Sequence, residues 1–150
     1  MNSPQHPEGI ALQVREALTE DIGGGDLTAR LVDADQVFTA TLISREPAIV
    51  CGGPWITAVF KQLDPSIEIE FLLQDSDRIE AMQTWCTVKG PARALLTGER
   101  TALNFAQALS GTGLHQMHSF LRLSVTFPIS VLCPSQRSHS FRRVRATRPM

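Results

Sequence analysis

The chain has 150 residues, with 14 Lys and Arg against 15 Asp and Glu, and a formal net charge of −1. Hydrophobic residues make up 43% and charged residues 19%, which indicates a folded globular chain rather than a disordered one. No apolar run approaches the roughly 20 residues that cross a bilayer, and the first residues lack the basic and apolar segments of a secretory signal. We therefore expect a cytoplasmic protein with no membrane partner.

The small net charge conceals two regions of opposite charge. Residues 1–113 hold eight basic residues against all fifteen acidic ones, a net charge of −7. Residues 114–150 hold six arginines, no lysine and no acidic residue, a net charge of +6. We expect a domain over 1–113 and a basic, Ser- and Arg-rich tail over 114–150 that is disordered or out of frame. Between Pro134 and Met150 only one aromatic residue, Phe141, accompanies the arginines, which does not make a nucleic-acid-binding pattern, so no nucleic-acid partner is expected.

The first half of the chain predicts two helices and a strand between them. Residues 8–22 carry apolar side chains at helical spacing, and the glycines Gly23–Gly25 end that helix. Residues 37–44 are rich in β-branched and aromatic side chains and predict a strand. A second helix follows over 54–63, where a proline suits the first turn. One face of the strand is expected to be apolar: Phe38, Ala40 and Leu42.

The second half adds more strands and a longer helix. Residues 67–72 alternate apolar and acidic side chains, which is typical of a half-buried strand, and 85–89 is a further strand candidate. Residues 94–110 predict a helix, and 120–132 are apolar enough for a strand or a helix. Strands and helices do not alternate regularly along the chain. The pattern therefore predicts an α+β fold, an antiparallel sheet with helices on one face.

Histidines and cysteines do not form a convincing metal or disulfide site. His115 and His118 are three residues apart, but no carboxylate lies near them in the basic tail. Cys51, Cys86 and Cys133 are an odd set without CxxC spacing, so reduced cysteines are expected.

Arg100 lies between Glu99 and Thr101, at the head of the apolar segment Leu103–Leu109. A guanidinium is a planar fork that can bind a carboxylate or phosphate through two hydrogen bonds. One arginine beside one glutamate is, by itself, more typical of a local ion pair. Composition and spacing alone do not assign this residue a function.

Three ordered blocks of the sequence resemble the quinolinate phosphoribosyltransferase family. The first runs from Ala17 to Ala29 as ALTEDIGGGDLTA, and the second from Ser44 to Gly52 as SREPAIVCG. The third runs from Leu95 to Phe105 as LLTGERTALNF and is followed by LSG at 109–111. Together they extend over about 110 residues, which is far more specific than any single motif.

The resemblance implies a pentosyltransferase of NAD biosynthesis. Such enzymes transfer phosphoribosyl from phosphoribosyl pyrophosphate to quinolinate with Mg²⁺, release carbon dioxide and give nicotinate mononucleotide. It also implies an amino-terminal open-faced sandwich and a carboxy-terminal barrel of TIM type. The homodimer places the first domain of one subunit over the barrel mouth of the other, so that Arg100 binds a quinolinate carboxylate across the interface. The resemblance assigns no catalytic residue and no metal ligand to residues 1–113, because the barrel binds Mg²⁺.

The resemblance stops near residue 113, and residues 114–150 do not match the family's barrel. We therefore expect a truncated, inactive form in which the reading frame is shifted, and resequencing the locus would test this. Two alternatives stay open. One is a related phosphoribosyltransferase domain that acts on nicotinate, and the other is a non-catalytic dimerisation or interaction module.

Overall fold

A computed structural model describes residues 7–23, 27–110 and 121–126 of the chain. Its helices and strands are, in chain order, α1 (Pro7–Ile22), α2 (Leu27–Arg30), β1 (Val37–Ser44), β2 (Ala48–Ile49), α3 (Gly53–Leu63), β3 (Glu68–Phe71), β4 (Arg78–Ile79), β5 (Thr84–Pro91), α4 (Ala92–Ser110) and β6 (Leu121–Thr126).

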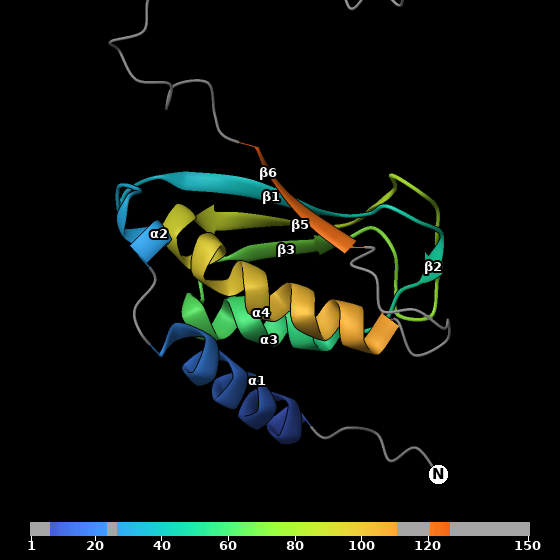
Figure 1. Ribbon diagram of the computed structural model, residues 1–150, viewed down its shortest axis with the longest axis horizontal. Helices are drawn as coiled ribbons and strands as arrows, with labels where there is room; N and C mark the ends of the chain where they lie inside the picture. Colours follow the sequence, from blue (N-terminus) through green and yellow to red (C-terminus); the bar gives the residue numbers. More distant parts are fainter. Residues whose placement is uncertain (1–6, 24–26, 111–120, 127–150) are drawn as a thin grey trace, which may run out of the picture.

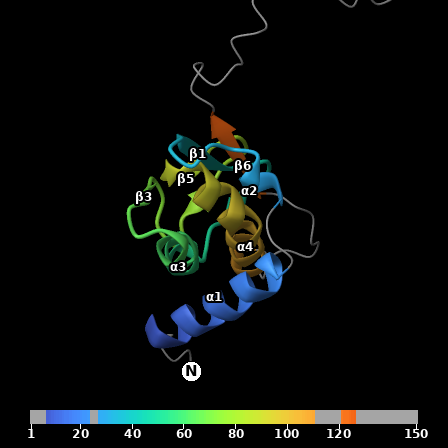
Figure 2. The same cartoon turned by 90° about the vertical axis from the view of Figure 1, so that its left-hand side faces the viewer.

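The described residues stack in three layers. The sheet formed by β3, β5, β1 and β6 is the first layer, and α3 and α4 lie side by side against one face of it (Figure 1). Helix α1 packs on α3 and α4 from the side away from the sheet, as the turned view in Figure 2 also shows. The prediction of an α+β fold with helices on one face of an antiparallel sheet is therefore confirmed.

Every neighbouring pair in the four-stranded sheet is antiparallel. The order is β3-β5-β1-β6, so the central strands are β5 and β1. Phe38 of β1 lies opposite Gly90 of β5, and the register shifts by a bulge between Leu42 and Ile43. A separate two-stranded sheet pairs β2 with β4. The sequence does not predict β4, because two residues are too few to establish an alternating pattern.

Strand β6 extends the sheet beyond residue 113. Its six residues pair with β1 from Ser44↔Leu121 to Thr39↔Thr126. It falls within the apolar stretch 120–132, for which the sequence left a strand or a helix open, and the structure has a strand. The domain boundary at 113 stays a prediction, as do the disorder and the shifted frame proposed for 114–150.

The core follows the alternation read from the sequence. Phe38, Ala40 and Leu42 of β1 are buried against the helices, as expected, while the threonines between them are half-buried. Trp85 and Val88 of β5 are buried with them. Helix α1 contributes Ile10, Val14 and Leu18, and α3 contributes Ile56, Val59 and Phe60. Burial of these side chains is the main stabilising contribution to the domain.

Helices α3 and α4 approach each other closely at Gly98. A Cβ atom at this position would lie 2.7 Å from Leu63 Cδ1 and 3.0 Å from Phe60 Cε1. Glycine therefore allows a contact that any larger residue would widen. This contact fixes the position of the second turn of α4, and Arg100 follows two residues later.

Candidate functional site

Helix α4 holds Arg100 at a defined place on the surface. The buried residues Leu95, Gly98, Ala102 and Ala106 recur every three or four positions and face the core. Arg100 lies midway in sequence between the buried residues Gly98 and Ala102, so its side chain projects from the opposite side of the helix. Its side chain is 81% exposed. The helix is anchored by its apolar face, while the guanidinium remains accessible.

A contact between α1 and α4 surrounds the base of this arginine. Thr101, which is 1% exposed, donates a hydrogen bond from Oγ1 to Asp21 Oδ2 at 2.6 Å. The other oxygen of Asp21, Oδ1, lies 3.8 Å from Arg100 Nε. Asp21 is next to the last residue of α1, and its side chain is 21% exposed. One carboxylate thus contacts both residues that follow Glu99.

The ion pair of Arg100 therefore reaches another helix. Among the described residues the structure has no ion pair between Arg100 and its neighbour Glu99, which the sequence had offered as the ordinary interpretation. Glu99 is partly buried instead, and this burial raises the pKa of its carboxyl. Asp21 was part of the first sequence block, but its sequence gave no sign that it would meet a residue 80 positions away.

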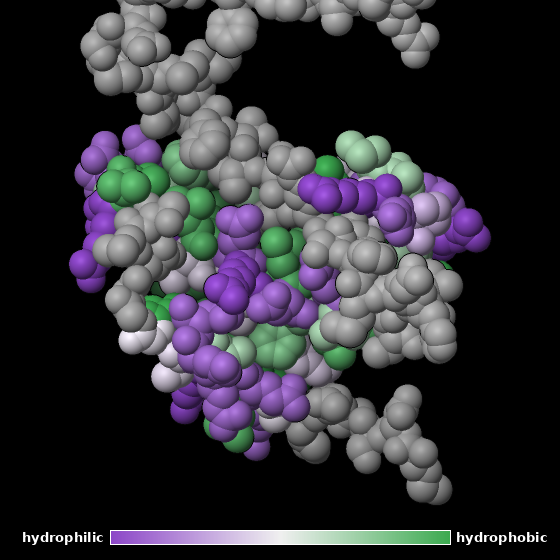
Figure 3. Space-filling model, viewed as in Figure 1, coloured by the Kyte–Doolittle hydropathy of each residue, from purple (hydrophilic) through white to green (hydrophobic). Residues whose placement is uncertain are grey.

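A shallow hollow of about 270 Å³ lies beside Arg100 on the surface of α4. Its lining combines one cation, one carboxyl, two amides and two leucines: Arg100, Glu99, Asn104, Gln107, Leu96 and Leu103. In the same orientation as Figure 1, Figure 3 shows hydrophilic side chains over the helices, with small hydrophobic areas between them. A guanidinium in such a setting can bind a planar carboxylate through two parallel hydrogen bonds.

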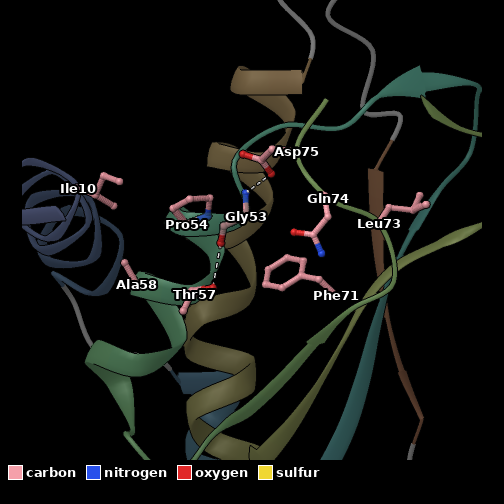
Figure 4. A pocket seen from close by; sticks show the side chains of 9 residues that line it. All are labelled: Ile10, Gly53, Pro54, Thr57, Ala58, Phe71, Leu73, Gln74 and Asp75. Atoms are coloured by element: carbon pink, nitrogen blue, oxygen red, sulfur yellow. Dashed lines mark hydrogen bonds between the residues drawn. The ribbon is translucent and has the colours of Figure 1, made fainter. Parts of the chain in front are cut away.

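A larger hollow of about 660 Å³ opens between α1, α3 and the segment after β3 (Figure 4). Its walls are mainly apolar, with Ile10 on one side and Phe71 and Leu73 on the other. The carboxylate of Asp75 accepts hydrogen bonds from the backbone N–H groups of Gly52 at 3.0 Å and Gly53 at 2.9 Å. This negative group at the start of α3 offsets the positive end of the helix dipole. Asp75 therefore has a structural role at this position.

The cysteines and histidines add no reactive centre to the described part of the chain. Cys51 and Cys86 are free thiols, while Cys133, His115 and His118 lie outside the described residues. Burial and the neighbouring Asp75 carboxylate raise the pKa of Cys51. No group of three or more His, Cys, Asp or Glu within the described ranges could hold a metal ion, and no helix there is long and apolar enough to cross a membrane.

Comparison with known proteins first defines the class to which this fold belongs. Two solved structures share it: the nicotinate-nucleotide pyrophosphorylase of Francisella tularensis, at 40% identity and a TM-score of 0.64, and NadC of Streptococcus pyogenes, at 28% identity and a TM-score of 0.69. The alignments cover 71% and 73% of this chain but only 37% and 40% of those chains. The open-faced sandwich is thus the fold of the amino-terminal domain of nicotinate-nucleotide pyrophosphorylases.

Sequence comparison gives the family itself. A family model described as "Quinolinate phosphoribosyl transferase, N-terminal domain" matches residues 26–110. The probable carboxylating nicotinate-nucleotide pyrophosphorylases of Synechocystis and Bacillus subtilis are 34% and 35% identical over 98 and 104 residues, which is 65% and 67% of this chain. The chain belongs to the quinolinate phosphoribosyltransferase family, as its three sequence blocks predicted. It spans about a third of the length of these curated relatives, 33% and 36% respectively.

Proposed function

We propose that this chain supplies the amino-terminal domain of a cytoplasmic phosphoribosyltransferase that makes nicotinate mononucleotide. The reaction joins quinolinate to phosphoribosyl pyrophosphate and releases pyrophosphate and carbon dioxide. The observation that carries the proposal is the position of Arg100, an 81% exposed guanidinium on a helix anchored in the core. The family model that matches residues 26–110 includes this helix.

The proposed role of Arg100 is to bind one of the two carboxylates of quinolinate. A guanidinium keeps its charge at any physiological pH and offers two parallel donors to a carboxylate. Closing the site against a second protein surface would remove water and strengthen this charge-assisted contact. The hollow beside Arg100 is shallow, so it can form only one wall of such a site.

The remaining walls are proposed to come from a barrel of another subunit in a dimer. That barrel is proposed to bind phosphoribosyl pyrophosphate and Mg²⁺, as the resemblance to the family implies. When bound, Mg²⁺ would stabilise the charge on the departing pyrophosphate. We therefore expect no nicotinate mononucleotide from the 150-residue chain supplied alone with both substrates and Mg²⁺.

A mixed dimer tests this proposal directly. The full-length Bacillus subtilis relative is made with alanine at the position that aligns with Arg100, which should abolish its activity. Adding this chain should restore activity, because a mixed dimer would carry Arg100 over an intact barrel. The R100A chain is the matched control and should bind the relative equally well without restoring activity.

The outcomes separate the alternatives. Restoration with quinolinate but not with nicotinate supports the proposed substrate, whereas restoration with nicotinate supports the related nicotinate-type domain. Binding without any restoration would indicate a non-catalytic dimerisation module. Absence of a mixed dimer in a pull-down experiment would refute the proposed assembly.

A further inference from the structure

We propose that Asp21 is a positioning residue that holds the Arg100 guanidinium in the orientation needed for substrate. This inference rests on the proposed role of Arg100. Asp21 Oδ1 lies 3.8 Å from Arg100 Nε, and Asp21 Oδ2 accepts the hydrogen bond of Thr101 at 2.6 Å. The two oxygens of one carboxylate thus have separate partners on the same turn of α4.

An arginine that is 81% exposed needs such a support. Its side chain has several freely rotating bonds, and a ligand that immobilises it must offset the lost conformational entropy. A carboxylate beside Nε reduces this freedom before the ligand arrives. Because Asp21 faces Nε, the two terminal nitrogens of the guanidinium remain available for a planar carboxylate.

Asp21 can orient the arginine because its own position is fixed. Thr101 is buried, its χ1 rotation is restricted by β-branching, and its hydroxyl holds Asp21 Oδ2 at 2.6 Å. Helix α1 is anchored by the buried side chains of Ile10, Val14 and Leu18. This anchoring places Asp21, near the end of α1, beside α4. The packing of α1 on α4 is therefore transmitted to the guanidinium through one carboxylate.

The first test measures the mobility of Arg100 in the full 150-residue chain. The D21N variant keeps an oxygen that can accept the Thr101 hydrogen bond but removes the negative charge. NMR relaxation of the Arg100 Nε–H group should show restricted motion in the wild-type chain and faster motion in D21N. The matched control is E20Q, which removes an exposed carboxylate one residue earlier and should leave this relaxation unchanged. Equal mobility in wild type and D21N would overturn the proposal.

The second test measures substrate affinity in the mixed dimer described above. D21N should raise the KM for quinolinate about threefold to fivefold, as expected for an exposed ion pair, and leave the KM for phosphoribosyl pyrophosphate unchanged. A lower KM for quinolinate would mean that Asp21 competes with the substrate for Arg100, and would also overturn the proposal. Failure of the wild-type chain to restore activity would contradict the proposed function, whereas the NMR result would still decide the role of Asp21.

Discussion

The contact of α3 with α4 at Gly98 can be tested by a single methyl group. The G98A variant would place a Cβ atom 2.7 Å from Leu63 Cδ1, 3.0 Å from Phe60 Cε1 and 3.2 Å from Phe60 Cδ1. Alanine favours a helix over glycine by about 1 kcal/mol, but overpacking a well-filled core costs about 1–3 kcal/mol. We expect the overpacking cost to exceed the gain in helix propensity, so that the free energy of unfolding falls by about 1 kcal/mol.

The matched control is the same substitution in α1. A Cβ atom at Gly9 would meet nothing within 4 Å, so G9A gains helix propensity without a packing cost. Because this residue lies in the first turn, we expect a gain of only about 0.5 kcal/mol. The two variants should therefore differ by about 1.5 kcal/mol in free energy of unfolding.

Urea unfolding monitored by tryptophan fluorescence would measure this difference, since Trp85 is completely buried in the folded chain. The G98A variant should also raise the KM for quinolinate in the mixed dimer, because Arg100 follows the displaced turn. A G98A chain as stable as G9A would refute the argument that the α3–α4 contact depends on the missing side chain.

Two further predictions concern the sheet. Burial raises the pKa of the Cys86 thiol from 9.0 to about 12, so above pH 9 the unfolded chain loses this proton before the folded chain does. The free energy of unfolding should therefore fall as pH rises from 9 to 12, measured by urea titration, and the fall should be smaller in C86A. Tyrosine, which titrates in the same range, does not occur in the chain. In β6, the backbone N–H groups of the adjacent residues Leu123 and Ser124 point to opposite sides of the strand, and only one side faces β1. Only one of the variants L123P and S124P should therefore break a hydrogen bond to β1 and speed amide hydrogen exchange in β1. Equal exchange rates in both variants would contradict the pairing of β6 with β1.

Much of the fold could be predicted because it depends on local patterns. The alternation in residues 37–44 predicted which side of β1 faces the core, and Phe38 and Leu42 are buried there. The apolar spacing in α1 likewise predicted its buried face, since periodicity in sequence becomes a single face of a helix. Packing partners could not be predicted in this way. That α1 forms a third layer on α3 and α4 depends on complementary surfaces far apart in the chain.

The sequence by itself determined the family, the α+β class and the candidate Arg100, because these are recorded in ordered residue blocks and local periodicity. Tertiary structure alone decided what surrounds that arginine. Asp21 and Thr101 are 80 residues apart and share a hydrogen bond only because α1 packs beside α4. A residue's chemistry is fixed by its type, but its partners depend on contacts between distant segments. Arg100 is thus a candidate because of its sequence motif, while its contact with Asp21 depends on the packing of two helices.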